Sequence, residues 1–116
     1  MAKMILAVLT NPVSQERDAE FNEWYTNTHL NDVLKVPGYV AATRFKLVDK
    51  PMMEGAEQPK QRYLAIYELD TDDVDQAAAQ LMTAVQDGGM SVSDSLDPAT
   101  IMANFYEQVS DRRTAQ

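Results

Sequence analysis

The sequence has no cysteine, only one histidine, and fewer basic than acidic residues. The absence of cysteine excludes disulfide scaffolds, zinc ribbons and thiol catalysis. Because His29 is the single histidine, metal sites that need two or more imidazoles are excluded as well, and we expect no bound metal. Acid–base chemistry near neutral pH must therefore use His29, or a carboxylate, lysine or tyrosine whose pKa is shifted.

Positive charge is scarce: the 116 residues carry 10 Lys and Arg against 18 Asp and Glu, a formal net charge of −8. This excess of negative charge repels phosphate backbones and anionic membrane surfaces, so we expect neither nucleic acid nor a membrane as partner.

Long apolar runs are also lacking. The first run, residues 4–9, is too short for a signal-peptide core or a membrane span. We expect a cytoplasmic protein with one domain over residues 1–110 and a solvated tail over 111–116.

Hydrophobic periodicity predicts four strands and two helices. The expected strands are residues 4–9, 39–48, 61–69 and 99–109, with a long proline-containing loop at 49–60. Helical periods cover residues 14–34 and 74–85. The expected caps and stops are, in chain order, Ser14, Asn31 at a short extra turn, Pro37-Gly38, Asp70 or Thr71, and Gly88-Gly89.

The resulting order, β-α-β-β-α-β, is typical of an α+β ferredoxin-like sheet with both helices on one face. The strands are apolar on both faces, so the uncovered face would be a large apolar patch on a monomer. The simplest cover is a second copy of the sheet, and we therefore expect a homodimer. We expect Arg44 and Lys46 on this second face or at its rim, because an unpaired cation under the helices is costly. There they would line one small, partly polar pocket per subunit.

His29 is the main catalytic candidate. It follows Tyr25 by four residues, so the two side chains share a face of a helix. Near a helix C-terminus the dipole favours the imidazolium, which suits a general acid as well as a base. The alternative role is structural, in which His29 caps its helix or bonds a neighbouring carbonyl.

Aromatic and cationic side chains supply the other candidates. Trp24 and Tyr25 are typical core residues, but lining a pocket they would favour a planar, conjugated ligand. Arg44 is the candidate for binding a substrate carboxylate. The expected substrate-binding set is Trp24, Arg44, Tyr67, Asn104 and Tyr106.

Residues 20–39 resemble the first helix and the second-strand entry of the EthD-like branch of the dimeric α+β barrel superfamily. The matching runs are Glu20-Phe21-Asn22-Glu23-Trp24-Tyr25, His29-Leu30, Asp32-Val33-Leu34 and Val36-Pro37-Gly38-Tyr39. The resemblance implies a homodimeric barrel with one pocket per subunit and no cofactor. It also implies that His29 faces that pocket, since a histidine does acid–base work in several related cyclases.

The superfamily includes polyketide cyclases, quinone-forming monooxygenases, muconolactone isomerases and haem-degrading enzymes. The haem-degrading branch carries a tryptophan and a haem-ligating histidine later in the chain. This sequence has neither residue after His29, so we do not expect haem.

These observations predict a small cofactor-independent enzyme that acts on an anionic substrate from aromatic or polyketide metabolism. An isomerase or hydrolase of a dienoate or lactone ring-cleavage product is favoured. His29 would move a proton, Tyr25 would orient His29, and Arg44 would hold a carboxylate, while Trp24 and Tyr106 would flank a conjugated system. The alternatives are a cofactor-free monooxygenase or polyketide cyclase, a non-catalytic ligand-binding stress-response module, and a filled barrel without a pocket.

Overall fold

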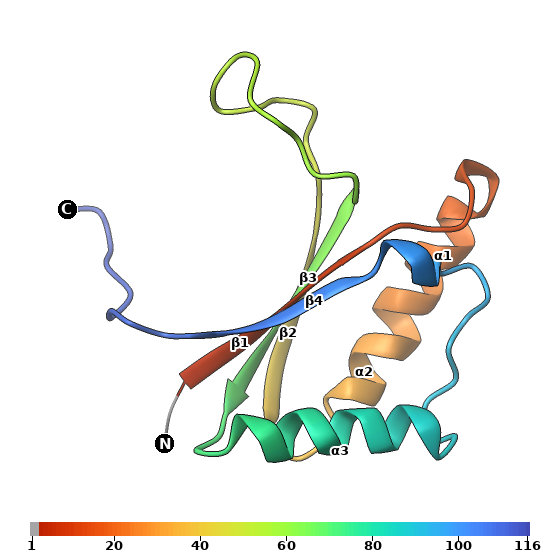
Figure 1. Cartoon of the computed structure of the whole chain (residues 1–116), viewed down its shortest axis with the longest axis vertical. Coiled ribbons are helices and arrows are strands. Elements are labelled where there is room, and N and C mark those ends of the chain that lie inside the picture. The colour runs from red at the N-terminus through yellow and green to blue at the C-terminus, as the bar shows by residue number, and fades with distance from the viewer. Residues whose placement is uncertain (1–2) are drawn as a thin grey trace.

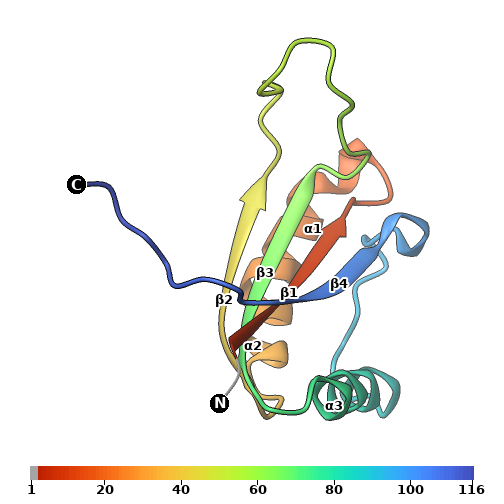
Figure 2. The ribbon, with the colours of Figure 1, turned by 60° about the vertical axis from the view of Figure 1, so that its left-hand side comes forward.

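The computed structural model describes residues 3–116 and shows one antiparallel four-stranded sheet with helices on one face (Figure 1). The strands are β1 (Lys3–Thr10), β2 (Tyr39–Lys46), β3 (Tyr63–Asp70) and β4 (Met102–Glu107). Their order in the sheet is β2-β3-β1-β4 (Figure 2), and every neighbouring pair is antiparallel. This is the ferredoxin-like α+β fold that the element order predicts.

The first helical region is continuous from residue 15 to 33 but changes its period. It consists of a 3₁₀ turn (Gln15–Arg17), α1 (Asp18–Trp24), a π-helical turn (Tyr25–His29) and α2 (Leu30–Val33). We call Tyr25–His29 the π-turn. The helix runs through the π-turn without interruption, so the prediction that Asn31 caps a separate turn is wrong. Ser14 does precede the helix, as expected, but its hydroxyl makes no capping hydrogen bond.

The second long helix, α3 (Val74–Gln86), is capped by Asp73, whose Oδ1 accepts a hydrogen bond from the Gln76 amide at 3.0 Å. The prediction of Asp70 or Thr71 as its cap is therefore wrong. Thr71 instead accepts a hydrogen bond from the Asp73 amide through its hydroxyl, which fixes the capping residue. A short 3₁₀ turn, Pro98–Thr100, leads into β4.

α3 ends just before Gly88-Gly89, as predicted, whereas α2 ends at Val33, before the predicted stop at Pro37-Gly38. Gly38 has a φ of +95° and Gly88 a φ of +76°, a backbone region that side chains with a Cβ rarely adopt.

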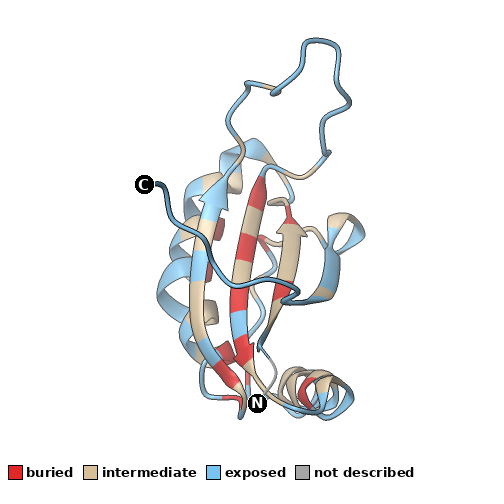
Figure 3. Cartoon of the chain, turned by 90° about the vertical axis from the view of Figure 1, so that its left-hand side faces the viewer, coloured by how far each residue is buried: buried red, intermediate tan, exposed pale blue. Residues whose placement is uncertain are grey.

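The core lies between the helices and one face of the sheet. Alternate residues of β3 are buried there (Figure 3), and they are Tyr63, Ala65, Tyr67 and Leu69. Phe21, Tyr25 and Val33 cover them from the first helical region. α3 crosses the lower end of this face (Figure 1), where the Tyr39 hydroxyl donates to the Ala77 carbonyl at 2.8 Å.

A β-bulge sets the direction of the side chains of β2. The register against β3 shifts between Tyr39 and Ala41, and Arg44 then pairs with Ala65, whose side chain faces the helices. Arg44 therefore lies under the helices, and the prediction that it lies on the opposite face is wrong. Lys46 has the same phase but is exposed at the rim, which was the other expected position.

The opposite side of the sheet, which we call the open sheet face, carries many apolar side chains. Ile5, Leu9, Leu64 and Ile66 are half-buried, and Phe45 and Met102 are 50% and 52% exposed. No helix within residues 3–116 covers this face (Figure 3). Its expected cover by a second copy of the chain stays a prediction.

Two segments extend away from the sheet (Figure 1). They are the connection between β2 and β3, residues 47–62, and the C-terminal residues 108–116. Within residues 3–116, no helix has the length and apolar character needed to span a bilayer.

Candidate active site

The π-turn brings Trp24 and His29 into contact. Their ring centroids are 4.9 Å apart and their planes are nearly parallel, at 29°. In a regular α-helix, residues five apart point about 140° away from each other, but the wider π period brings them to the same side. Tyr25 meets the His29 ring edge-on, with centroids 4.9 Å apart. The imidazole is thus held between two aromatic rings.

His29 is neutral at physiological pH. Burial lowers the pKa of its imidazole to about 4, and the partial compensation from the Asp32 carboxylate is opposed by the Arg44 guanidinium. The prediction that a helix end favours its cation is wrong for two reasons. The helix continues past His29 to Val33, so no helix C-terminus lies there, and desolvation is the largest effect on its pKa.

Nδ1 of His29 is buried and has no hydrogen-bond partner within residues 3–116. A neutral imidazole can accept a proton at its unprotonated ring nitrogen.

Arg44 lies in an aromatic cage. The carbon at the centre of its guanidinium is 4.4 Å from the Tyr25 ring centroid, 5.2 Å from that of Tyr63 and 5.5 Å from that of Phe21. Cation–π attraction to three rings explains how a cation is tolerated under the helices. Nη1 donates to the Thr26 hydroxyl at 2.9 Å.

The other edge of the Arg44 guanidinium is unsatisfied. Nε and Nη2 are buried without a hydrogen-bond partner, and the ion pairs of residues 3–116 involve Arg17, Lys35 and Arg62 but not Arg44. Burial accordingly lowers the pKa of Arg44. The Nε–Nη2 edge matches the two oxygens of a carboxylate, so this geometry suits an anionic ligand.

Tyr25 and Tyr67 form a buried phenol pair at the same place. The Tyr67 hydroxyl donates to the Tyr25 oxygen at 3.3 Å, and burial raises the pKa of both groups, so both are neutral. Tyr25 touches His29 and Arg44 through its ring, with no hydrogen bond to the imidazole. Tyr25 thus contacts His29 by ring packing alone, and its expected orienting role stays a prediction.

Trp24 is tied to the connection between α3 and β4. Its indole Nε1 donates to the Ser91 carbonyl at 3.0 Å, in the connection from α3 to β4. One face of the indole is stacked on His29. That face of Trp24 is thus occupied by the imidazole, and its expected role in substrate binding stays a prediction. Nothing in the sequence pattern pointed to Ser91.

Asn104 and Tyr106 are not brought to His29. They pair with Ala7 and Ile5 across β1, and their side chains project from the open sheet face. Of the seven candidate residues, the helix side gathers five, namely Trp24, Tyr25, His29, Arg44 and Tyr67. The sheet separates Asn104 and Tyr106 from that cluster.

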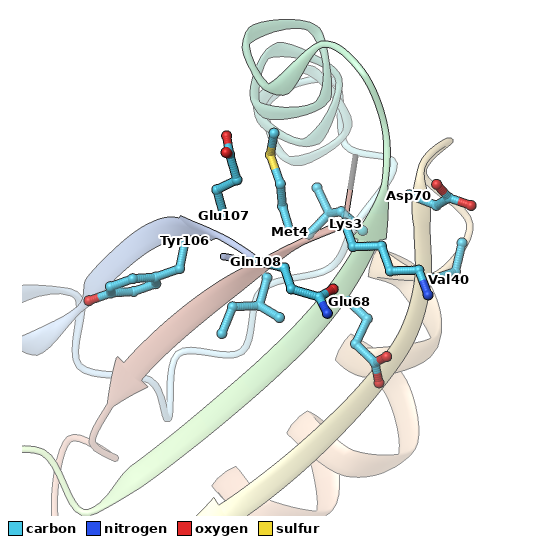
Figure 4. A pocket seen from close by; sticks show the side chains of 10 residues that line it. Lys3, Met4, Val40, Glu68, Asp70, Tyr106, Glu107 and Gln108 are labelled. Carbon is cyan, nitrogen blue, oxygen red and sulfur yellow. The ribbon is translucent and has the colours of Figure 1, made fainter. Parts of the chain in front are cut away.

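Tyr106 instead borders a separate hollow of about 530 Å³ (Figure 4). In this hollow the side chains of Glu68 and Gln108 lie next to each other, and that of Lys3 lies nearer to Val40. None of the five clustered residues lines it. It belongs to the side of the sheet that we expect a second copy to cover.

A smaller hollow of about 320 Å³ reaches Arg44 from outside. Its lining residues are Asp18, Asn22, Arg44, Phe45, Lys46 and Tyr63. The Tyr63 hydroxyl donates to Asp18 Oδ1 at 2.6 Å and accepts from Asn22 Nδ2 at 3.0 Å. The sequence reasoning missed these three residues, although the four-residue spacing of Asp18 and Asn22 places both on one helix face.

The donor set does not fit a metal or haem. Within residues 3–116, no three His, Cys, Asp or Glu side chains are grouped so that they could hold a metal ion. His29 is wedged between aromatic rings, and the chain after it offers no other histidine to ligate a haem iron. We therefore derive no step through haem.

No family model matches the sequence, and no curated relative matches it. Solved structures share its fold. A provisional monooxygenase from Shewanella loihica PV-4 has 18% identity and a TM-score of 0.57, covering 95% of this chain and 97% of that one. An ethyl tert-butyl ether D (EthD) family protein from Bacillus halodurans C-125 has 20% identity and a TM-score of 0.54, covering 94% of this chain and 100% of that one.

The haem degrader MhuD from Mycobacterium tuberculosis, solved with two haems in its active site, is 14% identical with a TM-score of 0.64. The alignment covers 95% of this chain and 99% of MhuD. Enzymes with different chemistry thus share this architecture. The resemblance of residues 20–39 is confirmed at the level of the fold: the chain has the ferredoxin-like α+β architecture that an EthD family protein also has.

Proposed function

We propose that the protein is a cofactor-independent enzyme that uses His29 as a base on a small, conjugated anion. The observation that carries the proposal is the buried, unpartnered Nε–Nη2 edge of Arg44, which contacts the same Tyr25 ring as the neutral His29. The favoured reaction is isomerisation or hydrolysis of a dienoate or lactone of the kind that aromatic ring cleavage produces.

Arg44 would bind the carboxylate of this substrate. The half-buried Arg44 makes no ion pair within residues 3–116, although the Asp18 carboxylate is near enough to act on its charge, and a carboxylate on the buried Nε and Nη2 would satisfy both donors with charge-assisted hydrogen bonds. The ring of Tyr63, which lines the hollow that reaches Arg44, would offer flat apolar contact to a conjugated skeleton, whereas Phe21 and Tyr25 are fully buried behind the guanidinium. A binding site of this kind selects planar anions.

His29 would carry the proton in both directions. Because its pKa is about 4, it is unprotonated at neutral pH and can accept a proton from an acidic carbon of the substrate. The imidazolium that forms is destabilised by burial and by Arg44, so it readily returns the proton to another carbon. The bond electrons stay in the substrate throughout, and the net result is a shifted double bond.

The test is turnover of a panel of dienoates and lactones by wild-type protein and by His29→Ala. Loss of a positioned base should slow turnover by about 10²- to 10⁴-fold. In heavy water, the wild-type protein should also exchange a substrate C–H for deuterium, and the variant should not. Thr28→Ala, at an exposed position of the π-turn, is the matched control and should behave as wild type.

Arg44→Gln tests the anion site separately. This variant should raise KM for carboxylate substrates much more than it lowers kcat, because the carboxylate is bound before and during the reaction. Turnover like that of wild type in His29→Ala would remove His29 from the mechanism. An unchanged KM in Arg44→Gln would show that Arg44 does not bind the substrate carboxylate.

A cofactor-free monooxygenase or a polyketide cyclase is the second enzymatic candidate. The structural likeness to the provisional monooxygenase from Shewanella loihica supports it. The same base would generate a carbanion, which would then react with dioxygen or with an internal carbonyl. Oxygen consumption that requires both substrate and His29 would favour the monooxygenase.

A non-catalytic ligand carrier is the remaining candidate. It predicts that anion binding survives in His29→Ala and that no compound of the panel is turned over.

A further inference from the structure

We infer that the anion bound at Arg44 carries a second anionic group, which binds at Lys46. This inference rests on the proposed function, because it extends the same site outward from Arg44. It narrows the substrate class to an extended, conjugated dianion, such as a dicarboxylate.

Arg44 and Lys46 lie on the same face of β2, paired with Ala65 and Tyr63 of β3. Two residues along a strand span about 6.6 Å. Both cations approach one aromatic ring: the Arg44 guanidinium carbon is 5.2 Å and Lys46 Nζ 6.0 Å from the Tyr63 centroid. The two positive charges therefore lie side by side along the strand, at a spacing that a short dicarboxylate can bridge.

The hollow that reaches Arg44 also continues outward past Lys46. A second hollow, of about 770 Å³, shares Asp18, Lys46 and Tyr63 with the first and adds Lys60 and Arg62. In a chain with a net charge of −8, four of the 10 basic residues thus lie along one path. Local positive charge of this kind draws an anion toward the buried guanidinium.

Acidic side chains line the same path, and most of them are engaged. Asp18 accepts a hydrogen bond from the Tyr63 hydroxyl, and Asp97 accepts one from the Ala99 amide. Glu16 is exposed at the outer hollow. No ion pair within residues 3–116 involves Lys46 or Lys60, so both cations are available to a ligand.

The test compares two anions with the same carbon skeleton, 2,4-hexadienoate with one carboxylate and 2,4-hexadienedioate with two. Calorimetric titration of the wild-type protein should show the dianion binding about 5- to 20-fold more tightly. Lys46→Gln should reduce dianion affinity to that of the monoanion and leave monoanion affinity unchanged. Lys50→Gln, which removes the same charge from the loop outside both hollows, is the matched control and should change neither affinity.

Asp18→Asn provides a test of opposite sign. Removing this negative charge while keeping a hydrogen-bond partner for Tyr63 should tighten dianion binding and affect the monoanion less. The preference for the dianion should also weaken as salt is raised, because Lys46 is exposed.

Equal affinity of the wild-type protein for the two anions would overturn this inference, as would an equal loss for both in Lys46→Gln. Either result would leave the proposed function standing if Arg44→Gln still weakened the monoanion. Failure of both anions to bind the wild-type protein would instead overturn the anion site at Arg44, and the second site with it.

Discussion

At the scale of the residue, Trp24 reports directly on His29, because the only tryptophan of the chain is stacked on the only histidine. A protonated imidazole quenches the fluorescence of an adjacent indole. Emission should therefore fall as the pH drops through about 4, with no step near 6.5, the usual pKa of histidine. A fluorescence titration under native conditions measures this. His29→Gln should abolish the step, and a step near 6.5 in the wild-type protein would show that the imidazole is not desolvated.

The same pKa shift makes stability depend on pH in a defined direction. In the unfolded chain His29 takes up a proton near pH 6.5, but in the folded protein only near pH 4. Lowering the pH between these values therefore favours unfolding, and the full stability is present above pH 6.5. Relative to His29→Gln, the wild-type protein should lose up to about 3 kcal/mol of unfolding free energy over this range. Urea unfolding at several pH values, compared between the two proteins, measures the difference; parallel curves would contradict it.

At the scale of the element, the start of α3 depends on one carboxylate. Asp73→Ala removes the acceptor of the Gln76 amide and should lower the unfolding free energy by about 1 kcal/mol. Asp75→Ala, in the first turn of the same helix, keeps that capping bond and is the matched control. Chemical denaturation of both variants measures the difference. Equal destabilisation by the two substitutions would mean that the capping hydrogen bond contributes no more to stability than a negative charge in the first turn.

The helices and strands themselves were predictable, because a period of two or of 3.6 residues marks the buried face of each element. The side-chain directions of the site were not. The pattern of β2 assumes strict alternation, and the bulge after Tyr39 adds one residue that reverses the phase of Arg44. Burial of the Arg44 cation is also costly unless aromatic rings surround it. Those rings come from α1, the π-turn and β3, which lie far apart in the sequence.

The π-turn has the same effect on the first helix. A regular helix predicts the contact between Tyr25 and His29, four residues apart, and that contact is present. It does not predict the stacking of Trp24 on His29, which needs a five-residue period. The histidine could be found from the sequence because no other exists, whereas its protonation state could not, because burial determines it.

At the scale of the whole molecule, the open sheet face should determine the oligomeric state. We expect a homodimer with the two sheets face to face, since Ile66 and its apolar neighbours would otherwise meet water. Ile66→Lys should give a monomer of lower solubility, and sedimentation velocity measures the change in mass. Gln86→Lys, an exposed substitution on α3, is the control and should leave the dimer intact. A wild-type monomer at micromolar concentration would contradict the expectation.

The central position of β1 has a consequence for how the chain folds. β1 pairs with β4, so Met4 lies opposite Glu107 and Leu9 opposite Met102. The first and last strands thus meet across nearly the whole chain, and the sheet cannot close until β4 has been synthesised. Pairings over such long loops are slow to form, because the loop entropy is lost before the contacts are gained. During synthesis, one edge of β1 stays open to other chains for most of that time.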